Sequence, residues 1–190
     1  MSENVKKYFK EQLDRTNQWL SFAEAKNAAL IVLDTAIIGF IVKLFLDAIL
    51  KTYDYSISLN FSIKPVHVFS LLLIIFLFSL LISIASFLPN LSSEKTKTKS
   101  DNMVETYNLL FFGDLAKFNS TDDYIRYVCR KYSFSDNYIE HPLIIDYANE
   151  ILINSKIAVR KYQLFRKAVY FSIVGGAISV ISLIVCLVMV

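Results

Sequence analysis

The sequence predicts an all-α integral membrane protein, with three transmembrane helices and a mostly helical cytoplasmic segment between the second and the third. Of its 190 residues, 55% are hydrophobic, and the mean hydropathy is +0.45. The apolar residues are gathered into three long runs, each close to the roughly 20 helical residues that cross a hydrocarbon core about 30 Å thick. Gly and Pro, which interrupt helices, number only 4 and 3. Helices that cross a bilayer therefore explain this composition better than a water-soluble domain does.

The three expected spans are residues 28–50, 66–88 and 168–190. The second and the third contain no Asp, Glu, Lys or Arg. Lipid can therefore surround both of them, and they are the clearest membrane anchors of the chain. Span three also carries Ser172 and other small residues along one face, which favours close packing of helices in lipid.

The first span differs from the others because it contains Asp34, Lys43 and Asp47. A charged side chain inside a bilayer is costly, so these groups must face protein, water or the interface. Two interpretations stay open. In one, the three residues line a polar seam between helices or subunits that conducts or gates. In the other, Lys43 and Asp47 pair at i,i+4 near the outer end of the span, and Asp34 caps a helix–helix contact.

The distribution of basic residues predicts the orientation. Of the 20 Lys and Arg, five precede the first span, two lie in the loop 51–65 and twelve lie in 89–167. Segments rich in Lys and Arg stay on the cytoplasmic side of a membrane. We therefore expect 1–27 and 89–167 in the cytoplasm, and the outer loop 51–65 and the C-terminus on the other side.

Residues 1–27 are predicted to form a cytoplasmic amphipathic helix that continues into span one, because Val5, Phe9 and Leu13 repeat at four-residue steps. In the outer loop, every second residue from Tyr53 to Ile63 is apolar, which is the period of a half-buried strand. Whether this segment pairs as a strand or lies on the membrane stays open.

Residues 89–167 are predicted to form a sensor or coupling segment. Ser120 can cap a helix with Asp123 three residues later, and Pro142 suits a first helical turn. From Leu143 onward, nothing interrupts the helical pattern before the glycine pair of span three. We expect one helix of about 48 residues, roughly 70 Å long, that joins this segment to the last span.

Signatures of enzymes and metal sites are absent from the sequence. It has no P-loop, no dinucleotide-binding glycine motif, no zinc-protease motif and no nucleophile elbow. Cys129 and Cys186 lie far apart and belong to no C-x-x-C pair. The net charge of +3 is too small to indicate nucleic acid by itself. We therefore expect no catalytic activity, no metal, no cofactor and no nucleic-acid partner.

Basic residues of the cytoplasmic segment form the candidate ligand site. Arg126 and Arg130 share a helix face at i,i+4, as do Lys156 and Arg160, and Lys161 follows. Such a cluster suits a phosphate, with nearby tyrosines to stack on a base. The alternative is that these residues bind anionic lipid headgroups or only set the topology.

Three stretches together resemble the Pycsar-type transmembrane effector family. They are Phe22–Asn27 before span one, Asn108–Asp114 after span two, and Ser155–Ala158 with Lys161 and Tyr162 before span three. The resemblance covers nearly the whole chain, although its outline explains neither three spans nor a charged first span. The motif positions that it marks as signal-coupling candidates are Glu24, Lys26, Phe112, Gly113, Asp114, Lys156, Lys161 and Tyr162.

The resemblance implies a short multi-span protein of the bacterial inner membrane, encoded beside a nucleotide cyclase in an anti-phage system. A cyclic pyrimidine mononucleotide, cUMP or cCMP, would activate the effector. Activation would impair the membrane and end in abortive infection. The ligand-binding or coupling candidates are then Arg126, Arg130, Lys156, Arg160, Lys161, Tyr162 and Asp114.

We therefore expect a membrane effector that forms a homo-oligomer and damages the bilayer, by a pore or by bilayer disruption, when its cytoplasmic part senses the nucleotide. The alternative is a non-enzymatic structural or regulatory membrane protein. Its cytoplasmic segment would recruit a protein partner and bind no nucleotide.

Overall fold

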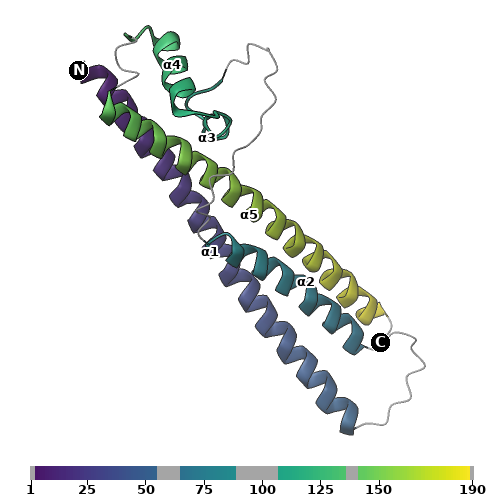
Figure 1. Cartoon of the computed structure of the whole chain (residues 1–190). Helices are drawn as coiled ribbons and strands as arrows, with labels where there is room; N and C mark the ends of the chain where they lie inside the picture. The colour runs from purple at the N-terminus through teal and green to yellow at the C-terminus, as the bar shows by residue number, and fades with distance from the viewer. Residues whose placement is uncertain (1–2, 55–64, 89–106, 136–140, 189–190) are drawn as a thin grey trace. The chain divides into compact units, whose positions relative to one another are not determined.

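The computed structural model describes residues 3–54, 65–88, 107–135 and 141–188, and all regular structure among them is helical (Figure 1). The elements are α1 (Glu3–Asp54), α2 (Pro65–Ala85), α3 (Phe112–Leu115), α4 (Thr121–Tyr132) and α5 (Pro142–Val188). Three of these helices, α1, α2 and α5, are long and apolar enough to cross a membrane. The all-α, three-span fold class is confirmed.

Local signals in the sequence place several helix ends correctly. The Ser120 side chain accepts a hydrogen bond from the Asp123 N–H at 3.1 Å, which is the expected cap of α4. The long C-terminal helix begins at Pro142 and has 47 residues. Helix α2 ends at Ala85, earlier than expected, and residues 86–88 form a turn. Tyr53 belongs to α1, and residues 55–64 of the alternating segment lie outside the described residues.

The chain forms two compact units, and α1 and α5 contribute to both. The head unit takes in residues 1–24 and 89–162, and the span unit takes in residues 25–88 and 163–190. The sequence separates 1–27 from 89–167 as two segments, whereas the structure packs the first part of α1 with residues 107–135 and 141–162 in one body.

The head unit has an aromatic-rich core. Its buried residues come from α1, from the segment 107–118, from α4 and from the first part of α5; the largest are Phe9, Leu109, Leu115, Tyr124, Ile125, Ile144 and Ile151. The rings of Phe9 and Tyr124 meet edge to face, with centroids 5.9 Å apart. Burial raises the pKa of the Tyr124 hydroxyl well above its usual value.

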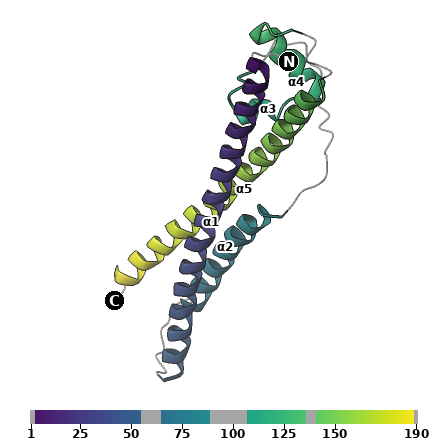
Figure 2. The same cartoon turned by 90° about the vertical axis from the view of Figure 1, so that its left-hand side faces the viewer.

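Helices α1 and α5 run side by side and in the same direction in the head unit (Figures 1 and 2). The Asn154 amide donates to Asn17 Oδ1 at 2.9 Å, and Lys161 Nζ donates to Glu24 Oε1, so that both pairs join residues 137 positions apart. Buried positions of α1 follow steps of three, four or seven residues: Val5, Phe9, Gln12, Thr16 and Ala23. This is the spacing of parallel helices that pack along one seam.

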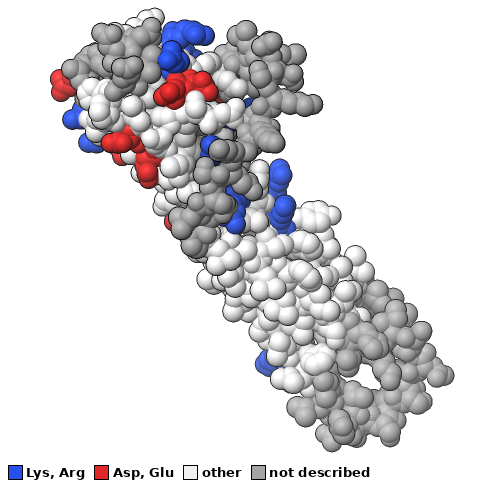
Figure 3. Space-filling model, in the orientation of Figure 1, with Lys and Arg blue, Asp and Glu red and all other residues white. Residues whose placement is uncertain are grey.

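The span unit has a small core and an apolar exterior. Ile41, Leu72 and Phe76 form its buried apolar cluster. Figure 3 shows charged side chains gathered over the head unit, whereas the visible face of the span unit is almost free of them. Exposed large apolar side chains cover the spans, among them Leu33, Phe40, Ile74, Phe78, Leu81, Ile173 and Ile181. An apolar exterior is what a helical bundle presents to lipid.

Candidate functional site

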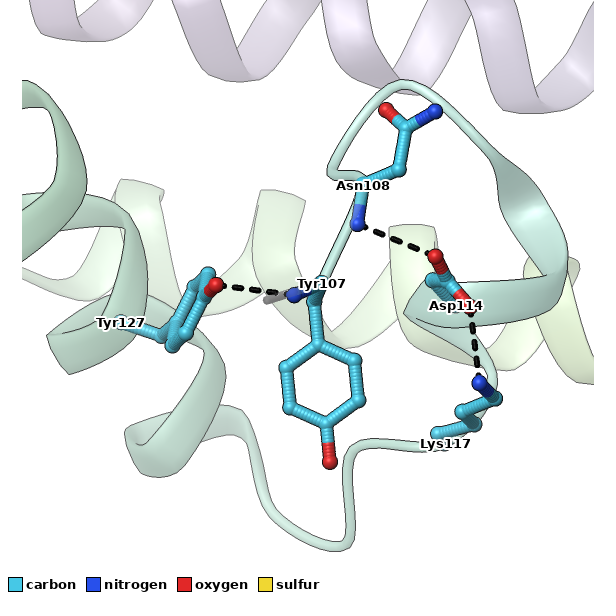
Figure 4. Close-up of polar contacts among 5 residues, drawn as sticks. All are labelled: Tyr107, Asn108, Asp114, Lys117 and Tyr127. Atoms are coloured by element: carbon cyan, nitrogen blue, oxygen red, sulfur yellow. Dashed lines mark hydrogen bonds and ion pairs between the residues drawn. The ribbon is translucent and has the colours of Figure 1, made fainter. Parts of the chain in front are cut away.

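The segment 107–117 of the head unit is built around Asp114 (Figure 4). One carboxylate oxygen accepts from the Asn108 backbone N–H at 3.0 Å, and the other lies 2.9 Å from Lys117 Nζ. The Lys117 ammonium lowers the pKa of Asp114 below its ordinary value. The Asn108 side chain accepts from the Leu110 N–H at 3.0 Å and tightens the same turn. Both oxygens of Asp114 thus serve the local fold of the segment.

Helix α4 holds the start of this segment. The Tyr107 N–H donates to the Tyr127 hydroxyl at 2.9 Å (Figure 4). Lys131 Nζ donates to the Tyr107 carbonyl at 2.6 Å. Both side chains come from the same face of α4, four residues apart, as helical periodicity requires. Helix α4 is therefore joined by two hydrogen bonds to the segment that carries Phe112, Gly113 and Asp114.

Four motif residues meet between α1, α3 and α5 in the head unit. The Phe112 ring lies against Trp19, with centroids 5.3 Å apart, and stacks on Tyr162 at 5.1 Å with 25° between the ring planes. Beside this stack, Lys161 pairs with Glu24. Burial raises the pKa of the Tyr162 hydroxyl. We name these five residues the coupling layer, because α1, α3 and α5 touch one another through them.

The other motif residues lie outside the coupling layer. Gly113 follows Phe112, and a Cβ atom there would clash with the Phe111 ring. Lys156 is exposed on α5. Lys26 belongs to the span unit, where its ammonium lies 5.8 Å from the centre of the Phe165 ring. The motif therefore marks positions in two structural contexts, one in each unit.

Among the basic candidates, Arg126 and Arg130 share a pocket. Both side chains are exposed on α4, and with Cys129, Ser133 and Phe134 they line an open pocket of about 340 Å³. Neither arginine forms an ion pair within the described part of the chain. Lys156 and Arg160 are also exposed, but on α5, and do not line this pocket. The structure thus brings Arg126 and Arg130 together and places Lys156 and Arg160 outside their pocket.

In the span unit, Asp34 lies fully buried where three helices meet. Its carboxylate oxygens lie 2.5 Å from Ser79 Oγ of α2 and 2.8 Å from Ser172 Oγ of α5. The two hydroxyls lie 2.8 Å apart, and Ser79 Oγ also lies 3.0 Å from the Ala168 carbonyl oxygen. Lys43 and Asp47 take no part, since both are exposed, and the described residues contain no ion pair between them. The structure therefore does not bring Asp34, Lys43 and Asp47 together.

The interior of the span unit divides into a polar part and an apolar part. Along α1, the span unit begins at Ala25, and its buried polar residues lie near this beginning. The apolar cluster of Ile41, Leu72 and Phe76 lies further along the helix. The polar set is Asn27, Asp34, Ser79, Ser83 and Ser86, with the partly buried Ser172. Sequence reasoning missed Ser79 and Ser83 of α2 and Ser86 in the turn that follows, although their spacing of four and then three residues is typical of one helical face.

Comparison with families of known proteins gives a match over nearly the whole chain. Residues 8–188 match the Pycsar effector protein domain. Comparison with curated proteins and with solved structures finds no match. The match spans both units, from the first turns of α1 to the end of α5. The chain, with its three helices able to cross a membrane and its motif-bearing head unit, therefore belongs to the Pycsar effector family.

Proposed function

We propose that this effector impairs the bacterial inner membrane when a cyclic pyrimidine nucleotide, cUMP or cCMP, activates it, and that abortive infection follows. Family membership supports the anti-phage role. The observation that supports membrane damage is the buried polar line from Ser86 to Asp34, which stops at an apolar cluster. An apolar constriction next to polar groups can block water and ions until the helices move apart.

The orientation follows from charge. The head unit carries most of the basic residues that the positive-inside rule places in the cytoplasm. A head unit in the cytoplasm meets a nucleotide where a cyclase would make it. The polar end of the span unit would then open toward the cytoplasm, and the apolar cluster would close the path toward the outside.

The nucleotide phosphate is proposed to bind at Arg126 and Arg130. Two like charges at i,i+4 destabilise a helix by about 0.2–0.5 kcal/mol, and an anion between them removes that repulsion. Guanidinium groups also suit phosphate oxygens in bidentate geometry. The Phe134 ring beside them offers an apolar face for a base.

Ligand binding reaches the membrane through helices that belong to both units. Binding on α4 would shift the Tyr127 and Lys131 contacts to Tyr107, and hence the segment that carries Phe112. Phe112 touches α1 through Trp19 and α5 through Tyr162. A rotation of α5 against α1 would then disturb the contacts between Asp34 and Ser172 in the span unit.

The direct test is membrane potential in bacteria that co-express the chain with a cyclase that makes cUMP or cCMP. We expect depolarisation with an active cyclase and none with an inactive one. Arg126→Gln with Arg130→Gln should abolish the response, whereas Lys156→Gln with Arg160→Gln, the matched pair on α5, should keep it. Depolarisation no greater than in control bacteria that do not express the chain would refute the proposal.

A second test addresses the polar line. Asp34→Leu should remove the depolarisation, and Asp34→Asn, which keeps a polar group at the same place, should retain part of it. Val42→Ala is the control, because Val42 is exposed on α1 and lies outside the buried contacts. Equal activity of all three variants would show that the damage does not pass through Asp34.

The alternative function is a structural or regulatory membrane protein that recruits a protein partner. The exposed Leu110 and Phe111 of the head unit favour a protein contact there. Thermal unfolding with and without cUMP and cCMP separates the two functions, since a specific ligand stabilises the state that binds it. An unchanged melting temperature with both nucleotides favours the alternative.

A further inference from the structure

Helix α1 carries a face of small, exposed residues in the span unit. Its buried residues there are Asn27, Leu30, Asp34 and Ile41. Roughly half a turn around the helix from them lies a second row at steps of four and three residues. This row, the small face of α1, consists of Ala25, Ala29, Val32, Ala36, Gly39 and Lys43, and all six are exposed.

Packing within the chain does not account for Gly39. A Cβ atom added at Gly39 would meet no atom within 4 Å. At Gly175, by contrast, a Cβ would lie 2.9 Å from the Phe76 ring and 3.1 Å from Ile75, so contact between α2 and α5 requires that glycine. Glycine inside a helix is unfavourable by about 1 kcal/mol relative to alanine. A small residue that its own chain leaves open suits close approach by another helix.

The charges at the end of this face indicate what that other helix is. Lys43 lies on the small face and Asp47 lies one turn further along; both are exposed within the span, and neither is ion-paired within the described residues. Lipid would leave both charges without a partner at considerable cost. A second copy of α1 in parallel orientation offers each Lys43 the Asp47 of the other chain, so the face is complementary to itself.

We propose that two copies of this chain pair in the membrane through the small face of α1. Ala29, Val32, Ala36 and Gly39 let the two helix backbones approach closely, and Lys43 of each chain pairs with Asp47 of the other. A two-fold axis parallel to the helices makes both ion pairs equivalent. The pairing needs no nucleotide, and it leaves the opposite face of α1 packed on α2 and α5.

Disulfide trapping tests the pairing directly. The single substitutions Val32→Cys, Ala36→Cys and Gly39→Cys are made in a Cys186→Ala background that retains the buried Cys129. Native membranes that contain each variant are then oxidised. We expect disulfide-linked dimers at all three positions. The controls are Leu33→Cys, exposed on another face of α1, and Gly176→Cys, an equally open glycine on α5. Equal trapping at control and test positions, or none at any, would overturn the proposal and leave lipid as the occupant.

A charge-exchange test separates pairing between chains from pairing within one. Chains with Lys43→Asp and chains with Asp47→Lys each lose both ion pairs when alone, and should trap about tenfold less at Ala36→Cys. Together they restore both pairs across the interface and within neither chain. Trapping of mixed dimers should therefore return to the level of the unaltered charges. If mixed chains trap no better than either chain alone, the Lys43–Asp47 pairing is wrong.

A larger side chain on the small face of α1 gives a third test of the pairing. Gly39→Leu should lower trapping at Ala36→Cys about tenfold, whereas Gly176→Leu should leave it unchanged. None of these measurements uses a nucleotide. Pairing without depolarisation would refute the proposed function alone, and depolarisation without position-specific trapping would refute the pairing alone.

Discussion

The head unit and the span unit hold the same two helices together by different means. In the head, α1 meets α5 amid a large aromatic and aliphatic core, and paired residues lie 137 positions apart. In the span, the apolar cluster has three buried members, and a buried carboxylate joins α1 to α5 at an offset of 138. The difference follows from the surroundings, because water drives apolar side chains together, whereas lipid tails are as apolar as the side chains themselves.

This contrast explains where the polar residues are buried. Hydrogen bonds and close backbone contact are what remain to join helices inside a bilayer. Asp34, Ser79 and Ser172 supply the hydrogen bonds, and Gly175 supplies the close contact. The same buried polar groups are also the least hydrophobic part of the span unit, so the feature that joins the helices is the one that the proposed function uses as a path along them.

The largest expected effect compares equivalent truncations in the two units. Phe9→Ala removes a fully buried ring from the head core, and this change should cost about 3–5 kcal/mol of head stability. Phe76→Ala should cost the span unit clearly less, because lipid contributes no hydrophobic transfer term. Hydrogen exchange of the reconstituted chain reports opening of each unit separately. An equal cost in both units would break the comparison.

A smaller effect is expected from the two adjacent glycines of α5. Gly175→Ala places a methyl group 2.9 Å from the Phe76 ring, so α2 must move away and span stability should fall by about 1–2 kcal/mol. Gly176→Ala meets open space and should be neutral or slightly stabilising. Thermal unfolding in lipid nanodiscs measures both variants. If Gly176→Ala destabilises as much as Gly175→Ala, close helix contact is not what holds the span.

The ion pair between Lys161 and Glu24 in the coupling layer should contribute less to stability than the close contact at Gly175 does. Lys161 is 13% exposed and Glu24 is 46% exposed, so solvent screens the pair and its coupling energy should be at most about 1 kcal/mol. A double-mutant cycle with Lys161→Met and Glu24→Gln measures it, and added salt should weaken it. A coupling energy independent of salt would mean that packing of the Lys161 stem, and not its charge, joins the helices.

The sequence predicts those parts of the fold that local signals determine. Hydropathy predicts three helices that can cross a membrane, and Ser120 and Pro142 predict where α4 and α5 begin. Pairing between distant helices has no such signal. Nothing near Asp34 in sequence indicates Ser79, 45 positions away, and nothing near Phe112 indicates that its ring lies between Trp19 and Tyr162. The packing of α1, α3 and α5 brings four of the motif residues together, whereas Lys26 lies in the span unit and Lys156 is exposed on α5.

The smallest effect concerns Asp114, and it depends on pH. The Lys117 ammonium holds the folded-state pKa of this carboxyl below the ordinary value of 3.8. A depressed folded pKa means that the carboxylate stabilises the head above the unfolded pKa, and that this contribution disappears as the pH falls through the folded pKa. Asp114→Asn should therefore lower the melting temperature of the head unit at neutral pH and match the unaltered chain in strong acid. Asp14→Asn, an exposed carboxylate on α1, serves as the control and should change nothing at either pH. A difference for Asp114→Asn that persists in strong acid would mean that the loop depends on the shape of this side chain and not on its charge.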